Sequence, residues 1–184
     1  TALFKEIKGR IKQTDMSVPY READYYYYTR FEAGKEYPIY CRKRVLDGME
    51  QVILDCNVMA TGYEFYAVET RAISSAQDIL AYTVDTVGRR ICTIQFKNLE
   101  TGEVLPDVIP DVTSNIAWAN DNRTLFYAKQ DPTTLRPFQI YRHRLGTSVS
   151  DDQLVYEEAD ETFGAAVFKT KSKKYLMVAS VQTL

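Results

Sequence analysis

The chain has 184 residues, of which 45% are hydrophobic and 26% charged, and its formal net charge at neutral pH is -2. This composition predicts a globular protein that can bury about 70% of the surface of its unfolded chain. A slightly acidic chain has no excess positive field for phosphate backbones, and no stretch approaches the ~18 apolar residues of a membrane span. We therefore expect no nucleic acid and no membrane as partners.

Three cysteines, Cys41, Cys56 and Cys92, are widely spaced in apolar or strand-like surroundings. An odd, scattered set predicts buried, reduced thiols in a cytoplasmic protein, and neither a disulfide framework nor a metal site. The sequence starts at Thr1 without a Met and lacks the basic-then-apolar pattern of a signal peptide. The missing Met agrees with a fragment of a longer protein, and a processed or trimmed chain would look the same.

The N-terminal segment 2–13 has the spacing of a short amphipathic helix. Leu3, Phe4, Ile7 and Ile11 recur at intervals of three and four, with Lys and Arg on the opposite face. Gly9 weakens such a helix by roughly 1 kcal/mol relative to Ala. We expect a helix that needs another surface to lie on.

After Pro19 the sequence favours short strands rich in aromatic and β-branched residues, bounded by Gly, Pro, Asn, Asp and Ser. They are expected at 25–31, 39–45, 51–55, 63–68, 79–84, 91–99, 117–118, 124–129, 138–144, 154–157, 165–169 and 175–180. Turn residues such as Gly34, Gly102 and Asn122 join them as antiparallel hairpins. The absence of long helix-periodic segments between strands argues against a parallel α/β sheet.

An imperfect repeat organises these strands. Segments 79–85, 124–130 and 175–181 begin 45 and then 51 residues apart, each after a polar turn. Four-stranded propeller blades recur at about this spacing. The fold class predicted is mainly β, a partial β-propeller of antiparallel four-stranded blades after a short N-terminal helix, with a β-sandwich as the alternative.

Nucleophilic catalysis by a serine needs a histidine as base, and the chain has a single histidine, His143. Strand alternation places His143 on the same face as Tyr141, with Arg142 and Arg144 on the other. No Gly-x-Ser-x-Gly turn supplies an exposed serine for it to activate. We therefore interpret His143 as a structural residue and expect no catalytic residue in this chain.

Metal and cofactor sites are also not expected. The acidic pairs Asp151-Asp152, Glu157-Glu158 and Asp160-Glu161 lack the spacing and central Gly of a calcium loop, and are predicted to form a solvated loop face. The glycines are isolated, so no phosphate-binding loop is present. One His and three scattered Cys do not form a zinc motif.

Two further clusters have structural explanations. Tyr25 to Tyr28 could offer a stacking surface for bases, but packing of a strand with aromatics on both faces is the favoured role. The basic clusters 42–44 and 171–174 could steer an acidic partner, although charged strand ends and turns also protect exposed sheet edges. We favour edge protection.

Several stretches taken together resemble a known family: 18–43, 96–110, 118–147 and 151–163, with the helix and the C-terminal KTKSKKYLMVAS in support. In order and separation they are similar to the oligopeptidase B group of the prolyl oligopeptidase family of serine peptidases. The resemblance implies an intracellular enzyme that cleaves short peptides after Arg or Lys. It further implies a catalytic α/β-hydrolase domain whose motifs are absent here, covered by a seven-bladed propeller.

On this resemblance, residues 1–17 would form a helix of the N-terminal extension and 18–184 the first blades of an incomplete propeller. The chain would be a non-catalytic scaffold and size-selective cover; a stand-alone β-rich binding module is the alternative. Its expected partners are the missing hydrolase domain, the remaining blades and, through the parent enzyme, peptide substrate. Exposed blade edges also predict that the fragment self-associates.

Overall fold

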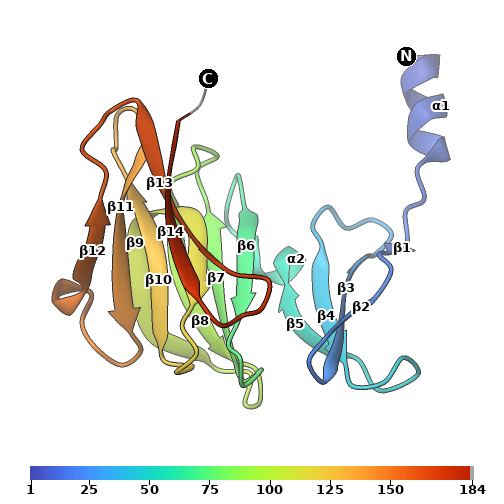
Figure 1. Ribbon diagram of the computed structural model, residues 1–184. Coiled ribbons are helices and arrows are strands. Elements are labelled where there is room, and N and C mark those ends of the chain that lie inside the picture. The colour runs from blue at the N-terminus through green and yellow to red at the C-terminus, as the bar shows by residue number, and fades with distance from the viewer. Residues whose placement is uncertain (183–184) are drawn as a thin grey trace. The chain divides into compact units, whose positions relative to one another are not determined.

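The computed structural model describes residues 1–182, and the chain divides into two compact units, Thr1–Tyr63 and Glu64–Leu184 (Figure 1). One short helix precedes a series of antiparallel sheets, which confirms the mainly β class. The division into units falls far from the domain boundary expected after residue 17. That boundary concerns the organisation of a longer protein and stays a prediction.

Helix α1 (Ala2–Arg10) begins as predicted and ends three residues earlier, because Ile11 has extended backbone angles (φ -79°, ψ 122°). Its apolar residues Leu3, Phe4 and Ile7 are 54–64% exposed, and no residue of the helix is buried. A nine-residue helix is marginal in water without tertiary packing. The expected apolar stripe is therefore present and uncovered within the described residues.

The first unit contains one antiparallel sheet in the order β1-β3-β4-β5, with β2 also paired to β3. Its strands are β1 (Asp15–Met16), β2 (Tyr20–Glu22), β3 (Tyr25–Phe31), β4 (Ile39–Lys43) and β5 (Gln51–Asp55). The short helix α2 (Cys56–Met59) follows, and the Asp55 carboxylate caps it by accepting the N–H groups of Asn57 and Val58. Tyr28, Ile39 and Cys41 form a small buried cluster on this sheet.

The second unit contains a seven-stranded antiparallel sheet in the order β12-β11-β10-β9-β8-β7-β6 and a two-stranded sheet β13-β14 (Figure 1). The strands are β6 (Ala67–Ile73), β7 (Ile79–Asp85), β8 (Cys92–Asn98), β9 (Val104–Trp118), β10 (Thr124–Gln130), β11 (Pro137–Arg144), β12 (Gln153–Glu157), β13 (Phe163–Lys169) and β14 (Leu176–Gln182). A short 3-10 helix, η1 (Val149–Asp151), lies between β11 and β12.

Strand β9 joins two four-stranded ladders into the larger sheet. Its residues 104–112 pair with β8, whereas 112–118 pair with β10. The two ladders, β6 to β9 and β9 to β12, enclose a core that contains Phe96, Ile109, Trp118 and Tyr127. Each ladder has the four antiparallel strands that the repeat predicted for one blade.

The repeat is also visible in the backbone angles. Gln77, Asn122 and Lys173 have φ of 65°, 58° and 58°, and each lies two residues before one of the three repeated segments. Ala23, with φ 50°, has the same position before β3 in the first unit. The structure thus contains the three expected copies and adds a fourth that the sequence search missed.

Side chains connect the first strands of successive copies in the second unit. The Trp118 indole N–H donates to the carbonyl oxygen of Ala72 in β6 over 2.9 Å. The Asn115 amide donates to the carbonyl of Val167 in β13 over 2.9 Å and accepts the N–H of the same residue over 2.7 Å. The Asn115 side chain therefore connects β9 to β13 through a pair of hydrogen bonds, although the two strands belong to different sheets.

Two strand predictions were wrong. The strand expected at 63–68 lies at 67–73, and the one expected at 117–118 is the end of the 15-residue β9. Pro106 and Pro110 lie within β9, although proline is disfavoured inside a strand because it has no backbone N–H. The pairing of β8 with β9 shifts register between Cys92 and Ile94, and Asp111 in the facing segment has φ 58°, so an irregularity accommodates Pro110.

Candidate functional site

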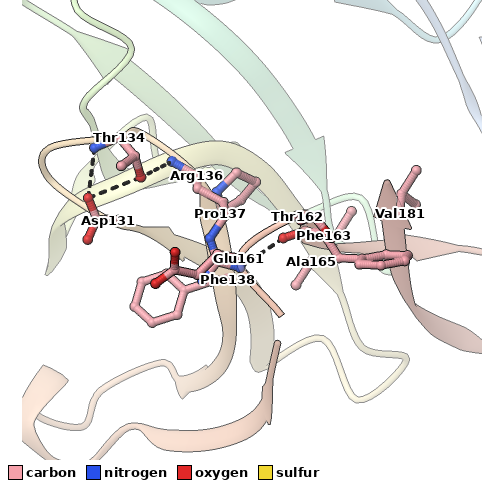
Figure 2. A pocket seen from close by; sticks show the side chains of 12 residues that line it. Asp131, Thr134, Arg136, Pro137, Phe138, Glu161, Thr162, Phe163, Ala165 and Val181 are labelled. Atoms are coloured by element: carbon pink, nitrogen blue, oxygen red, sulfur yellow. Dashed lines mark hydrogen bonds between the residues drawn. The ribbon is translucent and has the colours of Figure 1, made fainter. Parts of the chain in front are cut away.

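An open groove lies in the second unit where the β10–β11 turn meets the start of β13 and the end of β14 (Figure 2). Its volume is about 660 Å³. The lining residues combine a polar turn with an apolar wall: Asp131, Thr134, Arg136, Pro137, Phe138, Glu161, Thr162, Phe163, Gly164, Ala165, Ala166 and Val181. We call it the β11–β13 groove.

Arg136 organises one side of the groove. Its Nη1 donates to three backbone carbonyls, those of Phe163 at 2.8 Å, Asp160 at 3.2 Å and Glu158 at 3.4 Å. Its guanidinium carbon also lies 5.2 Å from the ring centroid of Phe138. These contacts attach the segment between β12 and β13 to the start of β11. The Arg136 guanidinium therefore has a structural role, because it binds backbone carbonyls.

Asp131 fixes the turn at the other end. Its carboxylate accepts the N–H groups of Thr133 at 2.9 Å and Thr134 at 2.7 Å, and the Thr134 hydroxyl at 3.1 Å. The hydrogen bonds from the Thr134 and Thr133 backbones lower the pKa of Asp131 below its ordinary value. The turn is therefore held by an ionised carboxylate over the neutral pH range.

The apolar wall continues onto an open strand edge. Among the described residues, β14 pairs with β13 alone. Met177, Val178 and Val181 of β14 are 45%, 38% and 57% exposed. The unpaired edge offers backbone N–H and C=O groups and the groove offers an apolar surface, which are the features used when a polypeptide strand adds to a sheet.

His143 lies away from this groove, in the core of the second unit. Its Nδ1 is 2.7 Å from an Asp152 oxygen and its Nε2 is 3.1 Å from an Asp107 oxygen, with the His143 side chain fully buried. The Phe96 ring stacks on it with 5.9 Å between centroids. His143 has the structural environment that strand alternation predicted, and its ring is sealed from any substrate.

The two carboxylates on His143 have further partners. Tyr127 donates its hydroxyl to Asp152 over 2.8 Å, and the Gly146 N–H donates to Asp107 over 2.6 Å. Burial, followed by the hydrogen bond to Asp152, raises the pKa of Tyr127. The sequence interpretation of Asp151-Asp152 as solvated was wrong for Asp152, whose side chain is 3% exposed. In the sequence, only the position of Asp152, nine residues after His143, could have indicated this contact. Nothing in the sequence indicated the contact with Asp107.

The other acidic pairs differ in their surroundings. Glu157, Asp160 and Glu161 are exposed, as a solvated loop face predicts, while Glu158 is half-buried. The Tyr156 hydroxyl donates to Glu158 over 2.7 Å, and the Ser180 hydroxyl also donates to it. The Ser180 and Tyr156 hydrogen bonds lower the pKa of Glu158. This carboxylate therefore links β12 to β14.

The cysteines are buried as expected, and none forms a disulfide within the described residues. Burial raises the pKa of Cys41 and of Cys92 to about 12, so neither thiol ionises at neutral pH. In residues 1–182 no group of three or more His, Cys, Asp or Glu could hold a metal ion. No described helix is long and apolar enough to cross a membrane.

The tyrosine run and the first basic cluster pack together in the first unit. Tyr27 and Tyr28 are buried, in agreement with a packing role. The interpretation of 42–44 as exposed edge residues was wrong for Arg42, which is only 1% exposed. Its guanidinium carbon lies 3.9 Å from the Tyr25 ring centroid, so an aromatic surface covers the charge. Cluster 171–174 is exposed in the turn before β14, as predicted.

Repeated four-stranded antiparallel ladders, followed by a further antiparallel pair of strands in a third sheet, are the features of propeller blades. The chain belongs to the prolyl oligopeptidase family: residues 1–184 match the profile of its N-terminal beta-propeller domain. This match favours the propeller over the sandwich alternative.

Relatives agree with this assignment. Dipeptidyl aminopeptidase BI of Pseudoxanthomonas mexicana is 40% identical over 99% of this chain, which covers 27% of that protein. Protease 2 of Moraxella lacunata is 33% identical over 97% of the chain, again covering 27% of the relative. The structure of oligopeptidase B from Leishmania major superimposes with a TM-score of 0.92 and 33% identity, over 98% of this chain and 26% of that one.

The chain therefore spans about a quarter of the length of these relatives. The oligopeptidase B resemblance found in the sequence is confirmed by the solved structure and by protease 2.

Proposed function

We propose that this chain is the non-catalytic propeller segment of a cytoplasmic serine oligopeptidase that hydrolyses short peptides after Arg or Lys. The 0.92 TM-score and 33% identity to an oligopeptidase B structure support the assignment of the parent to this type of peptidase. The segment acts as a scaffold and as a steric cover that admits short peptides and excludes folded proteins. Its catalytic partner is a hydrolase domain elsewhere in the parent protein.

The observation that carries the proposal is the repeat of antiparallel copies along the chain. In the second unit, the side chains of Trp118 and Asn115 link the first strands of successive copies by hydrogen bonds. The copy formed by β13 and β14 has two strands among the described residues, and neither the β14 edge nor the β11–β13 groove has a polypeptide partner there. A ring of blades leaves only short protected edges, so further blades are the expected occupants. A closed ring of blades over the active site would admit short peptides and exclude folded proteins by size.

A second specificity is favoured by the 40% identity to a dipeptidyl aminopeptidase. The experiment compares two fluorogenic substrates on the full-length parent: an N-terminally blocked peptide ending in Arg, and a dipeptide with a free amino group. We expect cleavage of the blocked Arg substrate. Cleavage of only the dipeptidyl substrate with the free amino group would replace the Arg/Lys proposal with a dipeptidyl aminopeptidase activity.

The cover role has its own test. Asn115→Leu in the full-length parent removes the two hydrogen bonds to Val167 while retaining side-chain volume. We expect kcat/KM for a long unfolded polypeptide to rise relative to that for a short peptide with the same cleavage site. Ser172→Ala, in an exposed turn, is the control. An unchanged ratio in Asn115→Leu would contradict size selection by the ring.

We also propose that the isolated chain is inactive, because the ring nitrogens of its one histidine each face a carboxylate in a sealed core. Purified chain should not cleave the blocked Arg substrate above background. Turnover that is lost in His143→Ala but kept in a wild-type control would overturn this.

A further inference from the structure

A fully buried histidine connects the two ladders of the second unit, and the proposed function makes no use of it. The side chain of His143 in β11 is 0% exposed, and those of its neighbours Asp107 and Asp152 are 5% and 3% exposed. We propose that His143 is an imidazolium cation held between these two carboxylates, and that its proton acts as a pH-sensitive lock between the ladders. Such a lock belongs to the fold and does not depend on what the parent enzyme cleaves.

Each ring nitrogen of His143 faces a carboxylate oxygen within hydrogen-bond distance. Nδ1 lies 2.7 Å from an oxygen of Asp152, and Nε2 lies 3.1 Å from an oxygen of Asp107. Turning the ring over would place carbon atoms against both carboxylates, so the contacts fix its orientation. A neutral imidazole has one N–H and one lone pair, and the lone pair would face an anionic oxygen. The imidazolium has an N–H at both positions and therefore satisfies both contacts.

The second proton belongs to the ring and not to a carboxylate. A carboxylic acid is a stronger acid than an imidazolium by roughly two pH units, so a proton between the two groups rests on nitrogen. Each carboxylate also accepts a further hydrogen bond, which favours its ionised form: the Gly146 N–H donates to Asp107 over 2.6 Å, and the Tyr127 hydroxyl donates to Asp152 over 2.8 Å. Burial, followed by the hydrogen bond to Asp152, raises the pKa of Tyr127, so this hydroxyl keeps its proton at neutral pH.

The groups around the ring come from both ladders. Asp107 lies in the part of β9 that pairs with β8, and Phe96 of β8 stacks on the imidazole with 5.9 Å between ring centroids. From the other ladder, Asp152 follows η1, and Tyr127 of β10 reaches the cluster through Asp152. The imidazolium is therefore the cation that both carboxylates share, and it links one ladder to the other.

Loss of the ring proton would leave two carboxylates beside an uncharged imidazole in a sealed core. Buried charges are costly when no opposite charge is paired with them, and the two anions repel each other. Because Asp107 and Asp152 belong to different ladders, this repulsion acts across the interface between the ladders. The contact between the ladders therefore weakens when the proton leaves.

The direction of the pH dependence follows from which state keeps the proton. In the unfolded chain a histidine loses its proton near pH ~6.5. The folded chain keeps this proton at higher pH, so above that value unfolding releases a proton. Stability from the lock is fully present below about pH 6.5 and falls as the pH rises, while the unfolding equilibrium constant increases by up to about tenfold per pH unit.

Nuclear magnetic resonance reads the ring directly, because the chain has a single histidine. The whole chain is labelled with nitrogen-15, and long-range proton–nitrogen correlation of the imidazole is recorded at about pH 8. We expect both ring nitrogens of the folded chain to have the chemical shifts of protonated nitrogens. In concentrated urea at the same pH the ring should be neutral. A folded ring with one unprotonated nitrogen would overturn the proposal.

Variants test the lock itself. Urea titration followed by the fluorescence of the buried Trp118 gives the unfolding equilibrium constant, which should rise about tenfold in the wild type between about pH 6.5 and about pH 8. His143→Gln keeps a hydrogen-bond donor without a titrating ring and should lose this rise. Asp151→Asn, an exposed change in the same segment as Asp152, should keep it.

Other groups that titrate in this range, such as the buried cysteines, contribute equally to each variant and cancel in the comparison. Equal pH dependence of the wild type and His143→Gln would contradict the lock. If His143→Gln does not fold, the resonance measurement on the wild type decides the protonation state.

Discussion

At the scale of single residues, a buried polar network surrounds His143 in the core of the second unit. Asp107 comes from β9, Tyr127 from β10 and His143 from β11, and Asp152 follows η1. The network therefore joins strands on both sides of β10. Buried polar groups are favourable only while each retains its partner, so the loss of one member leaves others uncompensated.

We predict that Asp152→Ala lowers the free energy of unfolding by about 3 kcal/mol, because it deprives both His143 Nδ1 and the Tyr127 hydroxyl of their acceptor. Urea titration followed by the fluorescence of the buried Trp118 measures it. The control is Asp151→Ala, an exposed neighbour expected to change stability by less than about 0.5 kcal/mol. Similar midpoints for the two variants would contradict the prediction.

At the scale of elements, each copy of the repeat has a residue with a positive φ in the turn before its second strand. In the last copy the Lys173 N–H donates to Thr170 over 2.8 Å, and the Thr170 N–H donates to Tyr175 over 2.9 Å. A β-branched residue is strongly disfavoured at a φ of 58°. This turn sets how β14 begins its pairing with β13.

We predict that Lys173→Val destabilises the β13–β14 hairpin by about 1–2 kcal/mol relative to Lys173→Gly, which adopts the positive φ freely. Hydrogen exchange of the β13 and β14 amides reports this locally. Lys171→Val, in the same turn but without a positive φ, controls for the change of side chain. Equal exchange in both Lys173 variants would show that the turn does not direct the hairpin.

Strands of strong alternation could be predicted from the sequence, and β3 and β5 have the expected bounds. The extent of β9 could not, because an irregularity at Asp111 allows a proline in a strand only in the context of β8. The same holds for sites. His143 was predicted to be structural from its own strand, whereas Asp107 is brought to it from 36 residues away by the pairing of two ladders.

The burial of the charged residue Arg42 could likewise not be predicted from the local sequence. A basic triplet at a strand end predicts exposure, yet Tyr25 of the neighbouring strand covers the guanidinium. The β11–β13 groove likewise depends on Arg136 binding carbonyls 22 to 27 residues away. Local patterns predict the elements, and only long-range packing determines which side chains meet.

At the scale of the whole molecule, β14 has one edge without a strand partner among the described residues and carries an exposed apolar surface. Phe168 and Tyr175 extend this surface beyond Met177 and Val181, all 45–57% exposed. We propose that the isolated chain self-associates through it, as unprotected strand edges do. In the parent protein, further blades would occupy the same edge.

We predict that Met177→Lys reduces this self-association, because a charge at an exposed strand edge opposes pairing between chains. Sedimentation velocity over a range of concentrations measures the oligomeric state. Val87→Lys introduces the same charge at an exposed loop position away from β14 and should leave association unchanged. A wild-type chain that stays monomeric at high concentration would refute self-association, and equal effects of the two substitutions would assign it to net charge instead of the β14 edge.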